Sequence, residues 1–306
     1  MSAATTRQTT LARPISIDGV GVHSGEPASV RLEPARADSG VVFVNDADSR
    51  EIKAVVANIG ATELCTTLVG EGWSVSTVEH LLAGLSGLGI DNAVVRIDGP
   101  EVPVMDGSSA PFVSAIDKAG VTEHDAARRF IRVLRPIRVE IGASYAELRP
   151  CETRRIEIEL DYAHPIVGRQ RFATDVTADS FRREIGSART FGFLGDVESL
   201  WARGLARGAS LENALVIGDD AVINPEGLRF DNEFARHKAL DALGDLALAG
   251  APILGCYRSY RGGHSLNARM LEVMLATPDA WEMVEERRPA VRRPAEADRP
   301  LVAAAP

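Results

Sequence analysis

The sequence is poor in several residue types whose abundance marks particular protein classes. Its three cysteines, Cys65, Cys151 and Cys256, lie far apart and lack the short paired spacing of a disulfide framework or a thiolate metal cage. Such cysteines suit a reducing compartment. No apolar run is long enough to span a bilayer, and residues 1–14 lack the apolar core of a signal peptide. We therefore expect a soluble cytoplasmic protein without a transmembrane segment.

Basic residues are also in deficit. The 34 lysines and arginines face 43 acidic residues, which gives a net charge of -9. A broad basic surface that could displace counterions from phosphates is absent, so we expect no nucleic-acid partner. Apolar residues make up 45% of the 306-residue chain, enough for one large core or two ordinary ones, and the usual domain size favours two.

The first half of the chain alternates between strand and helix patterns. Apolar and polar residues alternate over 14–17 and 29–32, which predicts antiparallel strands. Ser76 and Glu79 have the spacing of a capping box ahead of a leucine-rich helix that ends near Gly89. The remaining predicted elements of this half are a strand and a helix, over residues 92–97 and about 109–119.

The second half repeats this order. The predicted strands are 130–141, 145–148, 155–160 and 253–260, and the predicted helices are about 232–249 and about 267–275. We therefore predict an α+β fold of two similar domains, each a β-sheet packed against helices. A polar, charged stretch over 120–129 places the boundary near residue 126. The predicted domains are 1–126 and 127–284, and 285–306 is predicted to be a mobile tail.

Candidate metal ligands occur on both long helices. His237 and Asp241 are four residues apart, so they share one helix face and can reach one cation, with Asp245 one turn further along. Such a pair can equally be an ordinary ion pair on a solvated face. In the first half, Glu79 and His80 can border one cavity near the start of their helix. Their structural alternatives are the capping box and a hydrogen-bonded core histidine.

A third candidate, His264, follows a pair of glycines between a predicted strand and a predicted helix, where backbone can approach a ligand closely. Its alternative is a turn histidine. Taken together, His80, His237 and Asp241 form the nitrogen and oxygen ligand set of a catalytic zinc site with one open position. Glu79 is then the general base, and His264 is the remaining candidate for the acid.

At this point the sequence resembles the UDP-3-O-acyl-N-acetylglucosamine deacetylase family, the zinc amidases that catalyse the committed step of lipid A biosynthesis in Gram-negative bacteria. The resemblance runs from about Arg7 to about Trp281. The motifs that carry it are GVGVHSG at 19–25, TVEHL at 77–81, GIDN at 89–92, EVPVMDGS at 101–108, ARTFGF at 188–193, residues 224–230, residues 237–245 and GHSLN at 263–267.

The resemblance implies two domains with the active site at their interface, one zinc ion per chain and a monomer. It assigns Glu79 as general base, His264 as protonated general acid and Asp245 as the carboxylate partner of that acid. It also assigns Thr190 to the oxyanion and Lys238 to a position near the substrate. Such nitrogen and oxygen ligands accept several divalent ions, so Fe2+ is an alternative to Zn2+.

Substrate contacts are implied in the same way. The nucleotide diphosphate is expected to contact Lys238, His23, Tyr162 and Arg261, where Arg261 replaces a lysine of some members but keeps the charge. Apolar residues of 191–205, among them Phe191, Phe193 and Leu200, are implied to line the passage for the 3-O-acyl chain. Their helical spacing also fits an ordinary amphipathic helix on the core.

Three further interpretations remain open. Cys65 matches a cysteine near the metal of the family, whereas its spacing alone predicts a buried strand cysteine. An amidase of the same fold acting on another N-acyl sugar is the alternative enzyme, because a fold does not choose a substrate. A non-catalytic protein clamped by its metal is the alternative from another class, and it predicts a fourth protein ligand.

Overall fold

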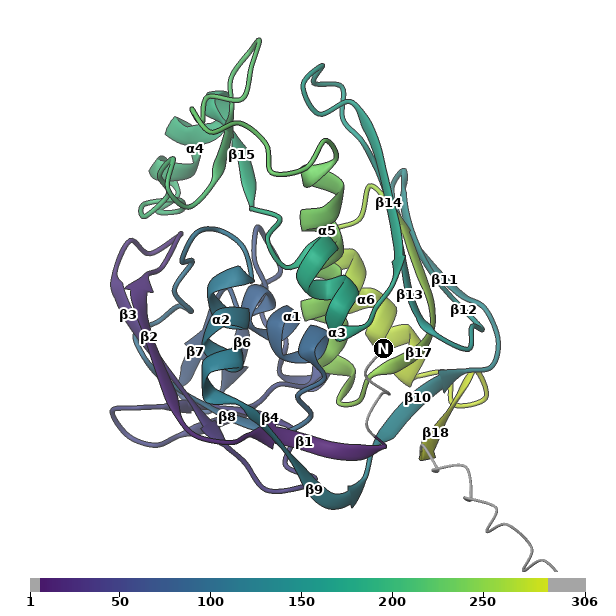
Figure 1. Cartoon of the computed structure of the whole chain (residues 1–306). Coiled ribbons are helices and arrows are strands. Elements are labelled where there is room, and N and C mark those ends of the chain that lie inside the picture. The colour runs from purple at the N-terminus through teal and green to yellow at the C-terminus, as the bar shows by residue number, and fades with distance from the viewer. Residues whose placement is uncertain (1–5, 286–306) are drawn as a thin grey trace, which may run out of the picture.

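The computed structural model describes residues 6–285 and has the predicted α+β architecture. Two sheets enclose a central layer of helices, so that the first half of the chain contributes one sheet and the second half the other (Figure 1). No helix within the described residues is long and apolar enough to cross a membrane.

The sheet of the first half has five strands. Their spatial order is β2 (Ile15–Val20), β3 (Pro27–Pro34), β8 (Ala93–Asp98), β4 (Val41–Asn45) and β5 (Glu51–Lys53). Two strand pairs flank it, β1 (Arg7–Leu11) with β9 (Val121–Ala127) and β6 (Leu68–Gly70) with β7 (Trp73–Val75). The helices are α1 (Glu79–Leu88) and α2 (Ala110–Ala119), and α2 packs on both α1 and β2.

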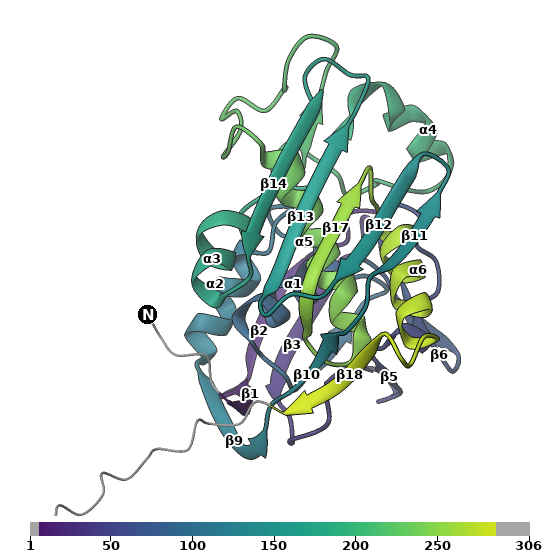
Figure 2. The same ribbon diagram turned by 90° about the vertical axis from the view of Figure 1, so that its right-hand side faces the viewer.

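The sheet of the second half has seven strands, seen face-on in Figure 2. They are β10 (Arg129–Val133), β11 (Ile137–Ile141), β12 (Ser144–Arg149), β13 (Arg154–Asp161), β14 (Arg169–Asp175), β17 (Ile253–Tyr260) and β18 (Trp281–Glu285). The short pair is β15 (Phe191–Phe193) with β16 (Leu215–Ile217). The helices are α3 (Ala178–Ser180), α4 (Val197–Ala202), α5 (Glu233–Leu246) and α6 (His264–Leu275).

Helices α1 and α5 pack directly against each other between the sheets (Figure 1). Nearly every residue of both helices is buried, as expected for helices with protein on all sides. Gly244 on α5 permits the close contact, because a Cβ there would lie 2.0 Å from the carbonyl oxygen of Glu79. The sequence-predicted alternative of a solvated face for His237 and Asp241 is therefore wrong.

The predicted domain boundary falls one residue before the end of β9, whose partner β1 belongs to the first half. The domain limits stay a prediction. Glu285, the first residue of the predicted tail, is the last residue of β18, and residues 286–306 lie outside the described part of the chain.

Local predictions failed where side chains bond to distant residues. The capping box is wrong, because α1 has no side-chain cap and the Glu79 carboxylate accepts a hydrogen bond from the Thr66 amide instead. Helix α6 begins at His264, three residues earlier than predicted, so this residue is not in the turn. Cys65 is buried as predicted but lies in a bend rather than a strand.

The predicted amphipathic helix over residues 191–205 is also wrong. Phe191 belongs to β15, and only residues 197–202 are α-helical. Helix α4 has no buried residue, and the side chains of Leu194 and Trp201 are 53% and 57% exposed. Phe191 and Phe193 pack against the core from β15, but the residues of α4 do not cover it.

Candidate active site

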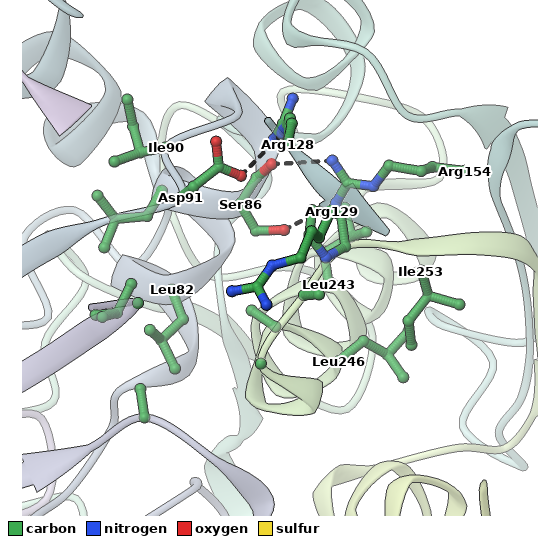
Figure 3. Close-up of a pocket in the computed structure, with 18 of the residues that line it drawn as sticks. Leu82, Ser86, Ile90, Asp91, Arg128, Arg129, Arg154, Leu243, Leu246 and Ile253 are labelled. Atoms are coloured by element: carbon green, nitrogen blue, oxygen red, sulfur yellow. Dashed lines mark hydrogen bonds and ion pairs between the residues drawn. The ribbon is translucent and has the colours of Figure 1, made fainter. Parts of the chain in front are cut away.

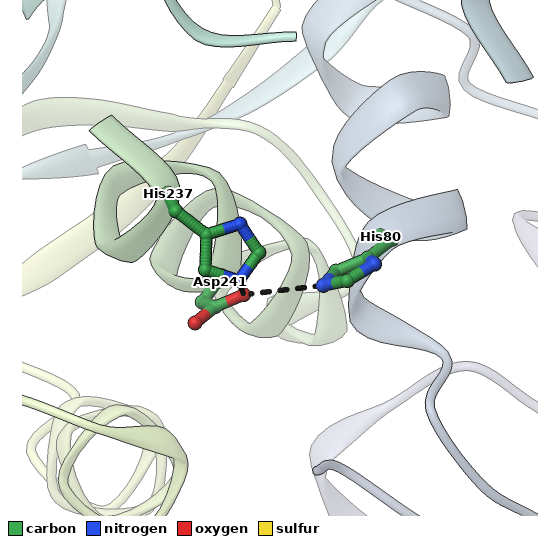
Figure 4. Close-up of side chains that lie close together, drawn as sticks. All are labelled: His80, His237 and Asp241. Carbon is green, nitrogen blue, oxygen red and sulfur yellow. Dashed lines mark ion pairs between the residues drawn. The ribbon is translucent and has the colours of Figure 1, made fainter. Parts of the chain in front are cut away.

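Three side chains that can ligate a metal converge where α1 meets α5. His80 extends from the first turn of α1, and His237 and Asp241 extend from one face of α5 (Figure 4). All three are buried, and their candidate ligand atoms lie within 4.8 Å of one another. Among the described residues this group contains no fourth side chain.

The spacing of these atoms fits a small divalent ion. Asp241 Oδ1 is 3.5 Å from His80 Nε2 and 3.3 Å from His237 Nε2. Two ligands bound to tetrahedral zinc at roughly 2.0–2.1 Å lie about 3.4 Å apart. His237 Nδ1 is 3.1 Å from the Ala188 carbonyl oxygen, and donation to this oxygen leaves the Nε2 lone pair facing Asp241 and His80. Burial lowers the pKa of His237 to about 3, so its imidazole is neutral, as ligation requires.

Glu79 sits beside this group in a constrained backbone. Its Oε2 accepts a hydrogen bond of 3.0 Å from the Thr66 amide, and burial raises its pKa. The preceding turn is strained, since Thr77 has a φ of 57° and its hydroxyl donates to Glu101 at 2.7 Å. Non-glycine residues with positive φ persist only where their surroundings hold them. The Glu101 contact therefore holds the backbone before Glu79, and the Thr66 amide orients the Glu79 carboxylate.

His264 faces Glu79 from the start of α6. Its Nε2 is 3.9 Å from Glu79 Oε1, and its Nδ1 is 2.8 Å from Asp245 Oδ2. Burial lowers the pKa of His264, but Asp245 and then Glu79 raise it more, to about 9. At neutral pH His264 is therefore an imidazolium that can donate a proton, and it faces the carboxyl group of Glu79.

Asp245 is itself held in place by two side chains. Its Oδ1 accepts 2.6 Å from the Thr66 hydroxyl, and its Oδ2 accepts 2.7 Å from the Asn267 amide. Thr66 thus contacts both Glu79, through its amide, and Asp245, through its hydroxyl. Thr66 could not be identified from the sequence, because nothing in its local pattern indicates contacts with residues 13 and 179 positions away.

The metal-ligand group, Glu79 and His264 line a cavity of about 730 Å3, and the other predicted site residues, apart from Asp245, line it too. Lys238 donates to Asp241 Oδ2 at 2.8 Å and lies 5.6 Å from the centre of the Phe191 ring. Burial lowers the pKa of Lys238, but the neighbouring Asp241 raises it more, so the lysine is charged. The further lining residues among those predicted are His23, Tyr162, Thr190, Phe193, Leu200 and Arg261.

Two further residues were not identified from the sequence. Ala188 contributes only its carbonyl oxygen to His237, a contact for which the side chain gives no signal. Glu101 accepts hydrogen bonds from the amides of His23 and Ser24 at 3.0 and 2.8 Å and so fixes the loop that carries His23 into the cavity.

Comparison with known proteins agrees with this geometry. A family model described as "LpxC: UDP-3-O-acyl N-acetylglycosamine deacetylase" matches residues 8–276. The chain is also similar to curated UDP-3-O-acyl-N-acetylglucosamine deacetylases of Brucella ovis, Brucella canis and Brucella melitensis. It is 54% identical to each over 281 residues, which cover 91% of this chain and 98% of each relative.

Proposed function

The chain belongs to the LpxC family of deacetylases, and from that membership we propose that it hydrolyses the N-acetyl group of UDP-3-O-acyl-N-acetylglucosamine. The products are acetate and UDP-3-O-acyl-glucosamine, in a step of lipid A biosynthesis. The observation that carries the proposal is the convergence of one buried histidine and one buried His/Asp pair beside a carboxylate and an imidazolium. These are the groups that metal-dependent amide hydrolysis needs.

His80, His237 and Asp241 are the residues we propose to hold the metal, with zinc as the ion. A bound zinc ion supplies a Lewis acid and lowers the pKa of its water from about 16 to about 7. Three protein ligands without a thiolate are typical of catalytic zinc sites, whereas closed structural sites carry four. This ligand number speaks against the metal-clamp interpretation.

Glu79 and His264 carry the protons in the proposed reaction. Glu79 accepts a proton from the water that attacks the acetamide carbonyl carbon, and the hydroxyl of Thr190 donates a hydrogen bond to the developing oxyanion. His264 then gives the proton on its Nε2 to the amide nitrogen, so that the C–N bond breaks and a free amine leaves. The 3.9 Å between His264 Nε2 and Glu79 Oε1 allows both groups to face one tetrahedral carbon.

The remaining cavity residues are proposed to bind the rest of the substrate. Arg261 and Lys238 supply cations for the diphosphate, and Arg261 can contact phosphate through two parallel bonds. Tyr162, Phe191 and Phe193 form an aromatic cluster, with the Tyr162 ring centre 6.1 and 5.8 Å from the two phenylalanine centres. His23 and Leu200 line the same space. We further propose a cytoplasmic monomer with the active site between its two domains.

The decisive experiment incubates zinc-loaded protein with UDP-3-O-acyl-N-acetylglucosamine and measures released acetate with and without a chelator. We expect release that stops on chelation and returns with added zinc. Iron is tested in parallel by reloading with Fe2+ without oxygen. Release from another N-acetyl sugar but not from this substrate would favour the alternative amidase.

A further inference from the structure

The structure has a second cavity, of about 350 Å3, and Figure 3 shows side chains that line it. It is lined by the C-terminal parts of α1 and α5 and by the first residues of β10, β13 and β17. None of its lining residues also lines the active-site cavity. The two cavities are therefore separate, and the proposed chemistry does not use the second one.

One side of this second cavity is apolar. This side, which we call the leucine wall, is formed by Leu82 of α1, Leu243 and Leu246 of α5 and Ile253 of β17 (Figure 3). All four side chains are buried, so this side of the cavity borders the core, whereas the exposed Asp38 and Arg129 border its opening to solvent. Such a wall favours an alkyl chain over a polar ligand.

The other side is cationic. Among the lining residues are five cations, Lys53, Arg128, Arg129, Arg154 and Arg155, and two carboxylates, Asp38 and Asp91. Three of these cations are in ion pairs, Arg128 with Asp91, Arg129 with Asp38 and Arg155 with Glu157 and Asp175, so the excess of positive charge comes from Lys53 and Arg154. An anionic group in the cavity would be attracted by this excess.

Two of these cations, Lys53 and Arg154, have no acidic partner among the described residues, and of the two only Lys53 is exposed. Arg154 Nη1 and Nη2 donate to the carbonyl oxygen and hydroxyl of Ser86 at 3.1 and 2.8 Å, and no carboxylate of the described residues is within ion-pair distance. Arg128 is paired with Asp91 at 2.8 Å. Burial and then the neighbouring Arg128 lower the pKa of Arg154 to about 10, so the side chain remains charged at neutral pH.

A purely structural role accounts for only part of this arrangement. The contact with Ser86 places a cation at the C-terminal end of α1, where it stabilises the free carbonyl groups. However, a guanidinium has five N–H donors, and Ser86 uses two of them. Two guanidiniums that approach each other around a cavity also repel each other, and an anion between them removes that repulsion.

We propose that this cavity binds a single-chain anionic amphiphile, with its carboxylate or phosphate head between Arg154 and Arg128 and its alkyl chain along the leucine wall. The planar donors of arginine match both kinds of head group. The volume is at the lower end of the roughly 300–1,000 Å3 typical of small-molecule sites, which suits one short alkyl chain. The proposal is independent of the deacetylase reaction.

Calorimetric titration of the zinc-loaded full chain tests this assignment. Decanoate and decyl phosphate are the probes, and they distinguish a carboxylate from a phosphate head. Inorganic phosphate has the anionic group without an alkyl chain, and decanol has the alkyl chain without a charge. We expect both to bind at least about tenfold more weakly than the better amphiphile. Comparable binding of decanol would remove the role of the cations and overturn the proposal.

Two variants locate the bound probe. Arg154→Met removes the head-group contact and should weaken binding by about tenfold or more, the usual effect of losing a charged hydrogen bond. The unliganded variant also loses the two hydrogen bonds to Ser86, so it should melt somewhat lower than the parent, and its affinity is measured below that melting temperature. Leu246→Phe fills the part of the cavity proposed for the alkyl chain and should also weaken binding. This variant tests the proposal if Arg154→Met does not fold. Parent-like affinity in either folded variant would overturn the proposal.

Arg261→Met is the matched control, because it removes one arginine from the active-site cavity instead. Affinity for the better amphiphile should be unchanged in this variant. A loss in Arg261→Met as large as that in Arg154→Met would mean that the probe occupies the active-site cavity, and the second site would be rejected.

Discussion

The Asp245→Asn variant tests how the structure sets the acidity of His264. The carboxylate lies 2.8 Å from His264 Nδ1, and Thr66 and Asn267 hold it there. Asparagine keeps the shape and removes the charge. Because an adjacent carboxylate typically changes a pKa by about 1–3 pH units, we expect the pKa of His264 to fall from about 9 by that amount.

The sign follows from the role of the acid. The protonated imidazole is the active form, so kcat/KM should be level below the pKa of His264 and should decline above it. If the pKa falls by about 2 units, the protonated fraction at pH 8 falls by about tenfold, and kcat/KM falls with it. Activity at acidic pH should change much less.

The assay is acetate release by zinc-loaded protein from pH 5.5 to pH 10, with the zinc content measured at each pH. Asp279→Asn serves as the control, because this carboxylate is exposed and pairs with Arg135 far from the cavity. An alkaline limb at the same pH in Asp245→Asn and the parent would refute the assignment of His264 as an acid tuned by Asp245.

Three further predictions concern the base, the contact between α1 and α5, and a buried ion pair. Glu79→Ala should keep the fold and the metal but lower kcat by about 10²–10⁴-fold, as measured by acetate release together with zinc content. Gly244→Ala should lower the free energy of unfolding by about 1–3 kcal/mol in urea titration and displace Glu79, because its Cβ would lie 2.0 Å from the Glu79 carbonyl oxygen. Glu233→Ala should lower that free energy by about 3–5 kcal/mol, since it leaves the buried Arg189 without its 2.9 Å partner.

Each of these predictions has an internal comparison. Gly84→Ala, also on a central helix, meets nothing closer than 3.5 Å and should leave activity unchanged. Glu226 also pairs with Arg189 but its side chain is 51% exposed, so Glu226→Ala should lower the free energy of unfolding by less than about 1 kcal/mol. Equal effects of the Gly84 and Gly244 changes, or of the Glu226 and Glu233 changes, would contradict the packing argument.

Periodic apolar patterns predicted most of the regular structure. The strand over 253–260 has the predicted bounds, and α5 and α2 begin within one residue of their predicted starts. Each of these elements buries one face or a whole strand, and this burial requires apolar residues at regular spacing that can be detected in the sequence. The short strands β15 and β16 carry three residues each and therefore leave no period to detect.

Two predictions were wrong because the same local sequence pattern is compatible with more than one structure. Ser76 and Glu79 have capping-box spacing, yet the Glu79 carboxylate accepts from Thr66, because a functional carboxylate needs partners outside its own helix. The segment 191–205 has helical apolar spacing, yet most of it lines a cavity or solvent. Spacing alone does not distinguish these surroundings from a core.

The sequence by itself determined the α+β class, the two leucine-rich helices and the His/Asp pair at positions 237 and 241, because each depends on neighbours within one helix turn or one strand. Only the tertiary structure decided that His80 meets that pair and that Thr66 joins Glu79 to Asp245. The same holds for the cavity between Arg154 and the leucine wall. Contacts between residues more than a hundred positions apart depend on how α1 packs against α5, and no local pattern records that packing.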